Sequence, residues 1–317
     1  MPEAPVALFA YRRPDHVRRT LASLAANPEA HGTDLIAFVD GPRTPAQADA
    51  VAATIAEIRR VEGFRSVTVH DRPVNYGLSA SVVDGVEQVL ADYPSVIVLE
   101  DDLEVSPAFL AYMNDGLQRF AETDEVVSIH GYVYPLRRPV PPAYVIRGAD
   151  CWGWSTWRRG WQVYRSDGAA LLAELHERGL ERVFDFDGAF PYTAMLRAQV
   201  EGRIDSWAVR WYASAFLAGK VTVYPGRSLV RNIGQDGSGT HGDVGSAHHA
   251  ALPGRAPDLA ILQGRPIAED PDARAAFRDY FRREQSWHRK LAWQLRQWRR
   301  SVRSRAIGLA GSSARAA

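Results

Sequence analysis

The sequence predicts an α/β fold built on a mainly parallel β-sheet with helices on both faces. Short runs of apolar, mostly β-branched residues alternate with amphipathic helical stretches from residue 5 to residue 122. Polar or charged residues directly follow these runs, and the most acidic group is Glu100-Asp101-Asp102 after the run 96–99. Ligands of open α/β sheets bind just past the carboxyl ends of the strands. A ligand site is therefore expected at this edge of the sheet.

Hydrophobic periodicity gives the expected elements in order along the chain. Strands are expected at 6–10, 35–39, 67–70, 96–99, 126–130 and 221–225. Helices are expected at 14–26 and 44–61, from the loop 75–79 to about residue 93, at 171–180 and 192–199, and from 204 onward. Ser106 and Pro107 predict one more helix start, because serine caps helices and proline favours the first helical position.

The composition narrows the class of protein. The chain has 317 residues, of which 46% are hydrophobic and 24% are charged, which is typical of a soluble globular protein. A net charge of +1 gives no overall field for nucleic acid, so no nucleic-acid partner is expected. Cys151 is the single cysteine, which excludes an intrachain disulfide. No stretch approaches the roughly 20 apolar residues of a membrane span, so the cytoplasm is the expected location.

Three consecutive carboxylates, Glu100, Asp101 and Asp102, are the strongest candidate for the ligand site. Like charges this close repel one another unless a cation or a polar ligand offsets them. Hard oxygen ligands suit Mg²⁺ or Mn²⁺, and these ions suit a substrate that carries a diphosphate. The competing interpretation is that the acids complement the dipole of the following helix. Because Ser106 already supplies a cap, we favour the ligand site.

Other strand ends carry weaker candidates. Arg12 and Arg13 follow the first strand beside a helix N-terminus, where they fit either a diphosphate site or a pair of surface arginines. Asp40 ends the second strand, where it can hold a ribose or a base edge, or form an Asx turn. The loop 75–79 leads into another helix N-terminus. Since no Gly-x-Gly-x-x-Gly follows the first strand, a classical dinucleotide fold is not supported.

Aromatic and glycine-rich segments stand out in the second half. The tryptophans cluster there, with four of the nine between residues 151 and 161. This run fits a sugar-binding platform and an aromatic core equally well. The loop 232–242 is rich in glycine and contains His241, so it is expected to close over a ligand as a lid.

A long basic helix is expected at residues 271–305. A stripe of tryptophan and leucine runs along it, and arginines populate the other positions. Two interpretations stay open: residues 282–305 dock on an anionic membrane surface, or the apolar stripe packs on the main domain. The last dozen residues are small and polar and are expected to be disordered.

Four segments form a joint pattern: Ala10-Tyr11-Arg12-Arg13-Pro14, the acidic stretch 98–107, Trp152-Gly153-Trp154, and the glycine-rich loop that ends near His241. Together they resemble the nucleotide-sugar-dependent glycosyltransferases of the GT-A fold. The acidic stretch is similar to that of N-acetylglucosaminyltransferase I. The tryptophan run and the glycine-rich loop are similar to bacterial sugar transferases of polysaccharide biosynthesis. The resemblance covers about residues 5–242 and implies the GT-A fold.

The resemblance also implies roles for single residues. Asp102 would bind Mn²⁺ or Mg²⁺, and His241 would complete the metal or diphosphate site. The implied donor-binding residues are Ala10, Tyr11, Arg12, Arg13, Asp40, Asn75, Gly77, Ser79, Glu100, Asp101 and Trp154. Asp205 is the implied catalytic base, although the N-glycan enzyme has its base one position further on, where this chain has Ser206. Asp236 is the reserve candidate, and a helix cap is the alternative role for Asp205.

These features predict a metal-dependent, inverting glycosyltransferase, either a hexosyl- or an N-acetylhexosaminyltransferase. It would move a sugar, with a UDP-sugar favoured as donor, to a glycan or lipid-linked acceptor in bacterial surface polysaccharide synthesis, as a cytoplasmic protein working at the inner membrane face. The expected transferase domain spans residues 1–242 and consists of a nucleotide-binding half at 1–132 and an acceptor half at 143–242. An irregular loop is expected at 243–268, followed by a basic amphipathic helical tail at 269–306 and a disordered end at 307–317. The alternatives are a sugar nucleotidyltransferase and a catalytically silent glycan- or nucleotide-sugar-binding protein of the same fold.

Overall fold

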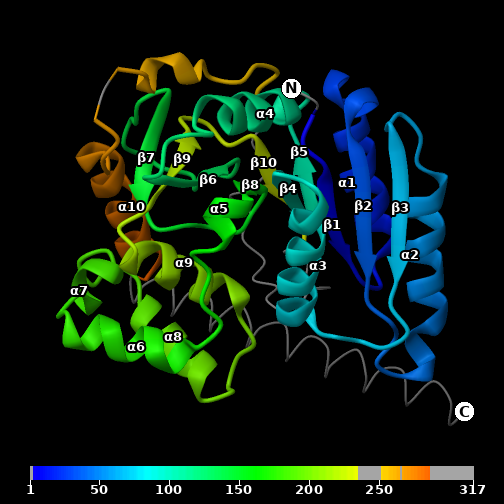
Figure 1. The fold of residues 1–317 in the computed structure, drawn as a ribbon, viewed down its shortest axis with the longest axis horizontal. Coiled ribbons are helices and arrows are strands. Elements are labelled where there is room, and N and C mark those ends of the chain that lie inside the picture. Colours follow the sequence, from blue (N-terminus) through cyan, green and yellow to red (C-terminus); the bar gives the residue numbers. More distant parts are fainter. Residues whose placement is uncertain (1–2, 235–250, 265, 286–317) are drawn as a thin grey trace, which may run out of the picture.

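A computed structural model describes residues 3–234, 251–264 and 266–285. Within these residues, an eight-stranded sheet has the strand order β3-β2-β1-β4-β8-β6-β9-β7, and β5 pairs with β10 in a separate ribbon (Figure 1). The strands are β1 (Val6–Ala10), β2 (Asp34–Val39), β3 (Ser66–Asp71), β4 (Ser95–Glu100), β5 (Leu103–Val105), β6 (Val126–His130), β7 (Ala143–Arg147), β8 (Trp154–Trp157), β9 (Val221–Pro225) and β10 (Val230–Asn232).

Helices surround this sheet. They are α1 (Pro14–Ala25), α2 (Ala48–Arg60), α3 (Leu78–Asp92), α4 (Phe109–Arg119), α5 (Arg158–Trp161), α6 (Gly168–Glu177), α7 (Glu181–Phe184), α8 (Tyr192–Val200), α9 (Trp207–Leu217) and α10 (Pro271–Glu284). In Figure 1, α6, α7 and α8 lie together on the side of the molecule opposite to β1, β2 and β3. The expected α/β fold with a flanked, mainly parallel sheet is therefore confirmed.

The strand order reverses between β1 and β4. Strands β3, β2, β1 and β4 are parallel neighbours, so the chain crosses from β1 outward to β3 and then returns to the other side of β1. Such a switch point opens a crevice at the carboxyl ends of the two strands. Further along the sheet, β8 runs antiparallel to β4 and β6, and β7 runs antiparallel to β9. The parallel pattern thus belongs mostly to the N-terminal half.

Alternation along β1 explains why the sheet has helices on both faces. Val6, Leu8 and Ala10 belong to the core cluster that includes the buried faces of α1, α2 and α4. Ala7 and Phe9 point the other way, into the cluster that includes α3 and several tryptophans. Successive side chains of a strand point to opposite faces. A fully apolar five-residue strand is therefore buried on both sides.

The helix expected at Pro107 begins two residues later, at Phe109. The reason is the short strand β5, which the sequence pattern did not reveal and which pairs with β10 from Val230 to Asn232. Ser106 follows β5 in a tight turn, where its hydroxyl accepts a hydrogen bond from the Ala108 amide at 3.0 Å. The hydroxyl also donates to the Pro253 carbonyl at 2.5 Å. Ser106 therefore ends the β5–β10 ribbon and does not cap α4.

The C-terminal helix α10 packs on the domain. Asp270 caps it by accepting from the Ala273 amide at 2.8 Å, and Pro271 occupies its first turn. Phe277 and Phe281 are buried in the same cluster as side chains of β7, β9 and α9. Residues 271–284 thus pack on the domain, whereas the stripe of tryptophan and leucine to which the two interpretations refer lies in residues 286–305, outside the described residues. No helix of the described chain is long and apolar enough to cross a membrane.

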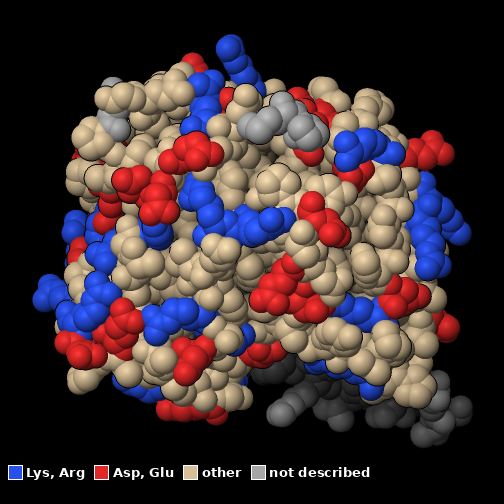
Figure 2. All heavy atoms as spheres, viewed as in Figure 1, with Lys and Arg blue, Asp and Glu red and all other residues tan. Residues whose placement is uncertain are grey.

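Charge on the face shown in Figure 2 is mixed. Basic and acidic side chains alternate over this face without a continuous field of one sign. The pattern agrees with the net charge of +1. This face offers no broad basic stripe of the kind that binds a nucleic-acid backbone.

Candidate active site

The acidic cluster sits where β1 and β4 end beside each other. Glu100 is the last residue of β4 and lies opposite Phe9 of β1. Asp101 is anchored by two contacts: its carboxylate accepts from the Tyr11 amide at 3.3 Å, and its carbonyl accepts from the Thr20 hydroxyl at 2.9 Å. The switch point of the sheet therefore brings together two segments that are 90 residues apart in sequence.

Arg13 is the positive charge that faces this cluster. Its guanidinium pairs with Asp101 and also with Asp102, at 2.9 Å from Asp102 Oδ2. Burial raises the pKa of Glu100, and the negative charges of Asp102 and Asp101 raise it further. Burial also raises the pKa of Asp101, although Arg13 acts against this shift. Within the described part of the chain, one guanidinium thus faces three carboxylates, so these carboxylates are short of positive charge there.

The cluster fits a divalent cation that a substrate helps to bind. Among the described residues, no group of three or more His, Cys, Asp or Glu side chains is arranged to hold a metal ion on its own. Mg²⁺ in phosphate-handling sites is commonly held by one or two carboxylates together with substrate phosphates. Asp102 offers such a carboxylate, since its side chain keeps 12% of its surface exposed. The predicted ligand His241 and the reserve base Asp236 lie outside the described residues.

Gly234 closes the space next to Asp102. The Ile233 amide donates to the Asp102 carbonyl at 2.8 Å, which holds the segment after β10 against the acidic cluster. A Cβ atom placed on Gly234 would lie 2.0 Å from Asp102 Oδ2 and 2.9 Å from Arg13 Nη1. Only glycine fits this close approach without moving the carboxylate.

Asp40 and the loop before α3 form a second part of the site. The Asp40 carboxylate is buried, accepts from the Gly77 amide at 2.9 Å and lies 3.5 Å from Arg72. Burial raises the pKa of Asp40, while Arg72 and the Gly77 amide act against this shift. Gly77 has a φ of +78°, which favours glycine. Asn75 ties the loop to β2, because its amide donates to the Gly41 carbonyl at 3.0 Å.

The remaining residues that were predicted to bind the sugar donor differ in what they contact. Ala10 ends β1, and its carbonyl accepts from the Asp40 amide at 3.2 Å. The Tyr11 hydroxyl contacts Gln47 at 2.5 Å, while the Arg12 guanidinium lies 5.8 Å from the centre of the Tyr11 ring. Ser79 is buried and its hydroxyl accepts from Arg210 of α9 at 2.5 Å. Ser79 thus ties α3 to α9 and has less freedom to bind a ligand.

Asp205 lies next to the loop that contains Gly77. Its Oδ2 would be 3.5 Å from a Cβ placed on Gly77, and both residues line a cavity of about 460 Å³ together with Arg43 and Asn75. The N-cap of α9 is Ser206, whose hydroxyl accepts from the Val209 amide at 3.3 Å. The capping role that the sequence left open for Asp205 is therefore filled by its neighbour, and the Asp205 carboxylate stays exposed.

Trp154 lies in the hydrophobic core and not at the donor site. Its side chain has no exposed surface, and its ring packs against Trp161, Trp207 and Trp211 at centroid distances of 5.5 to 5.8 Å. The predicted contact with the donor is corrected by this placement, since β8 pairs with both β4 and β6 in the middle of the sheet. The position of Trp154 therefore supports the aromatic-core interpretation of the tryptophan run.

Sequence reasoning missed several residues that position the site. Arg72, Arg43 and Arg210 each contact a predicted donor residue, at Asp40, Asn75 and Ser79 respectively. Single arginines in loops or helices give no local signal of such long-range contacts. For Arg72, its place directly after β3 was a usable signal, because the end of every parallel strand reaches this edge.

One family model matches the part of the chain that carries the acidic cluster. Residues 6–159 match the model of Glycosyl transferase family 2, a range that contains the acidic cluster and the Asp40 loop. No curated protein gives a match. Among solved structures, the mannosyltransferase PcManGT from Pyrobaculum calidifontis, in complex with GDP-Man and Mn²⁺, aligns with a TM-score of 0.40 and 10% identity over 69% of each chain. Residues 6–159, slightly less than half of the chain, are therefore similar to glycosyltransferase family 2, which is consistent with a fold of the GT-A type.

Proposed function

We propose that the chain transfers a sugar from a nucleoside diphosphate sugar to a hydroxyl group of a glycan or lipid-linked acceptor. The observation that carries this proposal is the under-compensated acidic cluster, Glu100 to Asp102, at the switch point of the region that is similar to family 2. A UDP-sugar is the favoured donor. Synthesis of bacterial surface polysaccharide is the proposed setting, based on the sequence resemblance in the tryptophan run and the glycine-rich loop.

Asp102 is the proposed metal ligand, with Mn²⁺ or Mg²⁺ as the cation. A divalent cation there would screen the negative charge on the departing nucleoside diphosphate. Arg13 lies 2.9 Å from the same carboxylate, so its guanidinium is placed to contact the diphosphate as well. Asp40 and the loop around Gly77 are proposed to hold the nucleoside, because their polar atoms gather at the ends of β2 and β3.

Asp205 is the proposed catalytic base. In a single displacement, the acceptor oxygen forms a bond to the anomeric carbon while the bond from that carbon to the phosphate oxygen breaks. The acceptor hydroxyl gives its proton to the Asp205 carboxylate, and the nucleoside diphosphate leaves with the bonding electrons. Inversion at the anomeric carbon follows from this geometry. An exposed carboxylate at the start of a rigid helix suits this role.

Contact with an anionic membrane through residues 282–305 stays a prediction, since only residues 282–285 of that segment are described. The test is cosedimentation with vesicles that contain an anionic phospholipid. A chain that ends before Arg282 should stay in solution, whereas the full chain should sediment with the vesicles. If the full chain does not bind them, the membrane contact is wrong.

A thermal-shift screen tests the proposed function. UDP- and GDP-sugars are added with and without Mn²⁺, and a true donor raises the melting temperature by mass action. Hydrolysis of the donor that binds is then compared between wild type and Asp102→Ala. We expect Mn²⁺-dependent binding and hydrolysis in wild type and loss of both in the variant. If wild type neither binds nor hydrolyses any nucleotide sugar with Mn²⁺, the proposal fails.

A further inference from the structure

A second cavity lies next to the N-terminus of α9. Its volume is about 190 Å³, and β7, β9, α9, α10 and the segment 186–195 contribute to its walls. That volume corresponds to about six water molecules at roughly 30 Å³ each, enough for one ring-sized group. Half of the lining residues are aromatic, and they include Tyr134, Phe186, Phe190, Tyr192, Tyr224 and Phe281.

Asp150 supplies a carboxylate in this aromatic cavity. Its Oδ1 accepts from the Cys151 amide at 2.8 Å, and the Tyr224 hydroxyl reaches its Oδ2 at a long 3.4 Å. His130 Nε2 is 3.7 Å away, and burial lowers the pKa of His130 to about 4, so this ring is neutral near pH 7. In the described part of the chain, no arginine or lysine pairs with Asp150. The Asp150 carboxylate therefore keeps lone pairs that can accept a further hydrogen bond.

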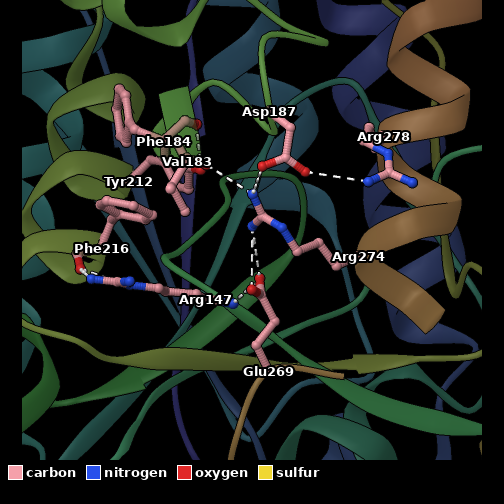
Figure 3. A network of polar contacts seen from close by, with 9 residues as sticks. All are labelled: Arg147, Val183, Phe184, Asp187, Tyr212, Phe216, Glu269, Arg274 and Arg278. Atoms are coloured by element: carbon pink, nitrogen blue, oxygen red, sulfur yellow. Dashed lines mark hydrogen bonds and ion pairs between the residues drawn. The ribbon is translucent and has the colours of Figure 1, made fainter. Parts of the chain in front are cut away.

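One wall of the cavity is held in place by an ion-pair network. Phe186 and Asp187 both have positive φ values, 49° and 59°, which are costly for residues other than glycine. Figure 3 shows the Asp187 carboxylate between Arg274 and Arg278 of α10, each at 3.4 Å. Arg274 also pairs with Glu269 at 3.2 Å. Contacts of this kind fix the strained segment, so the wall that carries Phe186 is preorganised.

The cavity also reaches the residue next to Asp205. Ser206 lines it, while Asp205 next in sequence lines the donor-side cavity. Cys151 also lines the cavity, and burial and the charge of Asp150 raise the pKa of its thiol. The start of α9 therefore contributes to both cavities, because Asp205 lines the donor-side cavity and Ser206 lines the aromatic one.

We propose that this cavity binds one sugar ring of the acceptor, with aromatic side chains packing on its C–H faces and Asp150 accepting a hydrogen bond from a ring hydroxyl. The proposal rests on the proposed function and assigns the acceptor to a cavity separate from the donor site. A sugar ring fits both properties of the cavity, since it has apolar faces and hydroxyl donors around its edge. Asp150 is then an acceptor-positioning residue, and Asp205 keeps the proton transfer.

Acceptor probes test this assignment directly. Binding of the p-nitrophenyl glycosides of glucose, galactose, mannose and N-acetylglucosamine is measured by saturation-transfer NMR without donor. Asp150→Asn keeps the bond from the Cys151 amide but removes the charge, and Phe190→Ala removes one aromatic wall. The matched controls are Asp124→Asn, an exposed acid, and Phe64→Ala, a half-buried ring packed on another cluster.

We expect wild type and both controls to bind at least one glycoside, and both cavity variants to bind it at least tenfold more weakly. Transfer to that glycoside should show the same rise in acceptor KM, while donor KM and donor hydrolysis stay within twofold of wild type. Unchanged glycoside binding in both cavity variants, or no binding by wild type, overturns the sugar pocket. A donor that fails to bind wild type overturns the proposed function instead, so the two failures are distinguishable.

Discussion

Gly234→Ala is a small change aimed at the position of Asp102. The Cβ atom of alanine would lie 2.0 Å from Asp102 Oδ2 and 2.9 Å from Arg13 Nη1. Asp102 Oδ2 belongs to the ion pair at the centre of the acidic cluster, and Arg13 Nη1 is part of the guanidinium that pairs with it. The segment cannot easily move away, because the neighbouring Ile233 amide is bonded to the Asp102 carbonyl. The carboxylate and the guanidinium must therefore shift instead.

The size of this shift sets the expected effect. Ordinary contact with a Cβ begins at 3.4 Å. The Asp102 carboxylate must then retreat by roughly 1.4 Å, and a misplacement of about 1 Å at a reacting centre can cost about 100-fold in rate. A 100-fold loss corresponds to about 2.7 kcal/mol of transition-state stabilisation. We therefore expect kcat/KM for Mn²⁺-dependent donor hydrolysis to fall about 100-fold in Gly234→Ala.

Gly254→Ala is the matched control. A Cβ on Gly254 would meet no heavy atom of the described chain within 4 Å. Donor hydrolysis is measured over a range of Mn²⁺ concentrations, together with the melting temperature of each variant. Gly234→Ala should lose activity while it melts close to Gly254→Ala. Equal hydrolysis by the two variants would refute the inference that the position of Asp102 controls the reaction.

Three further predictions concern other residues. Asp205→Asn should bind the donor within twofold of wild type and lose at least about 100-fold in the rate of sugar transfer. Unchanged transfer would remove Asp205 from the mechanism. The substitution leaves the cap of α9 intact, because Ser206 supplies it. Asp34→Asn should lower the free energy of unfolding at pH 7 by about 1 kcal/mol, since solvent screens part of the pair with Arg65. Folding lowers the pKa of Asp34, so its carboxylate stabilises the protein at pH values above the pKa that it has in the unfolded chain. This stabilisation is lost as the pH falls below that pKa. The melting temperatures of wild type and Asp34→Asn should therefore converge toward pH 2. Phe277→Ala should destabilise by about 3–5 kcal/mol in denaturant unfolding, and a change under about 1 kcal/mol would contradict the packing of α10.

Strand and helix periodicity predicted the first half of the fold well. The runs at β1, β2 and β4 are apolar over nearly their whole length, because helices cover both faces of the sheet there, whereas the edge strand β3 alternates valine with polar residues and stays partly exposed. The short strands β5 and β10 were missed, since three residues give too short a pattern to detect. Strand β8 was hidden by its tryptophans, which looked like a ligand platform but fill the core instead.

The candidate site was predictable where it depends on strand ends. Glu100, Asp101 and Arg13 meet because parallel strands finish at one edge, and that rule needs only the order of the elements. Asp205 was placed beside Gly77 only by the tertiary structure, since 128 residues separate them and no periodicity links α9 to the loop before α3. The cavity around Asp150 was not foreseen for the same reason: residues from six separate parts of the chain form its walls.

The acids at the two ends of the sheet differ in a way that bears on function. At the start of β2, Asp34 is bonded to Arg65, to the Ser66 hydroxyl at 2.6 Å and to the Tyr93 hydroxyl at 2.8 Å. These bonds, led by Arg65, hold its pKa well below its ordinary value. The fold can therefore supply enough hydrogen bonds and positive charge to a carboxylate whose role is structural.

At the end of β4 the balance is opposite. Burial and mutual repulsion raise the pKa of Glu100 and of Asp101, and Arg13 is the cation that faces both Asp101 and Asp102 in the described structure. Such a deficit disfavours the ionised cluster in the free protein, and proteins keep arrangements of this kind where binding or catalysis needs them. A cation that arrives with a diphosphate would add positive charge to the carboxylates and give Arg13 a second anionic partner. The same deficit that weakens the free protein would then strengthen the binding of the donor.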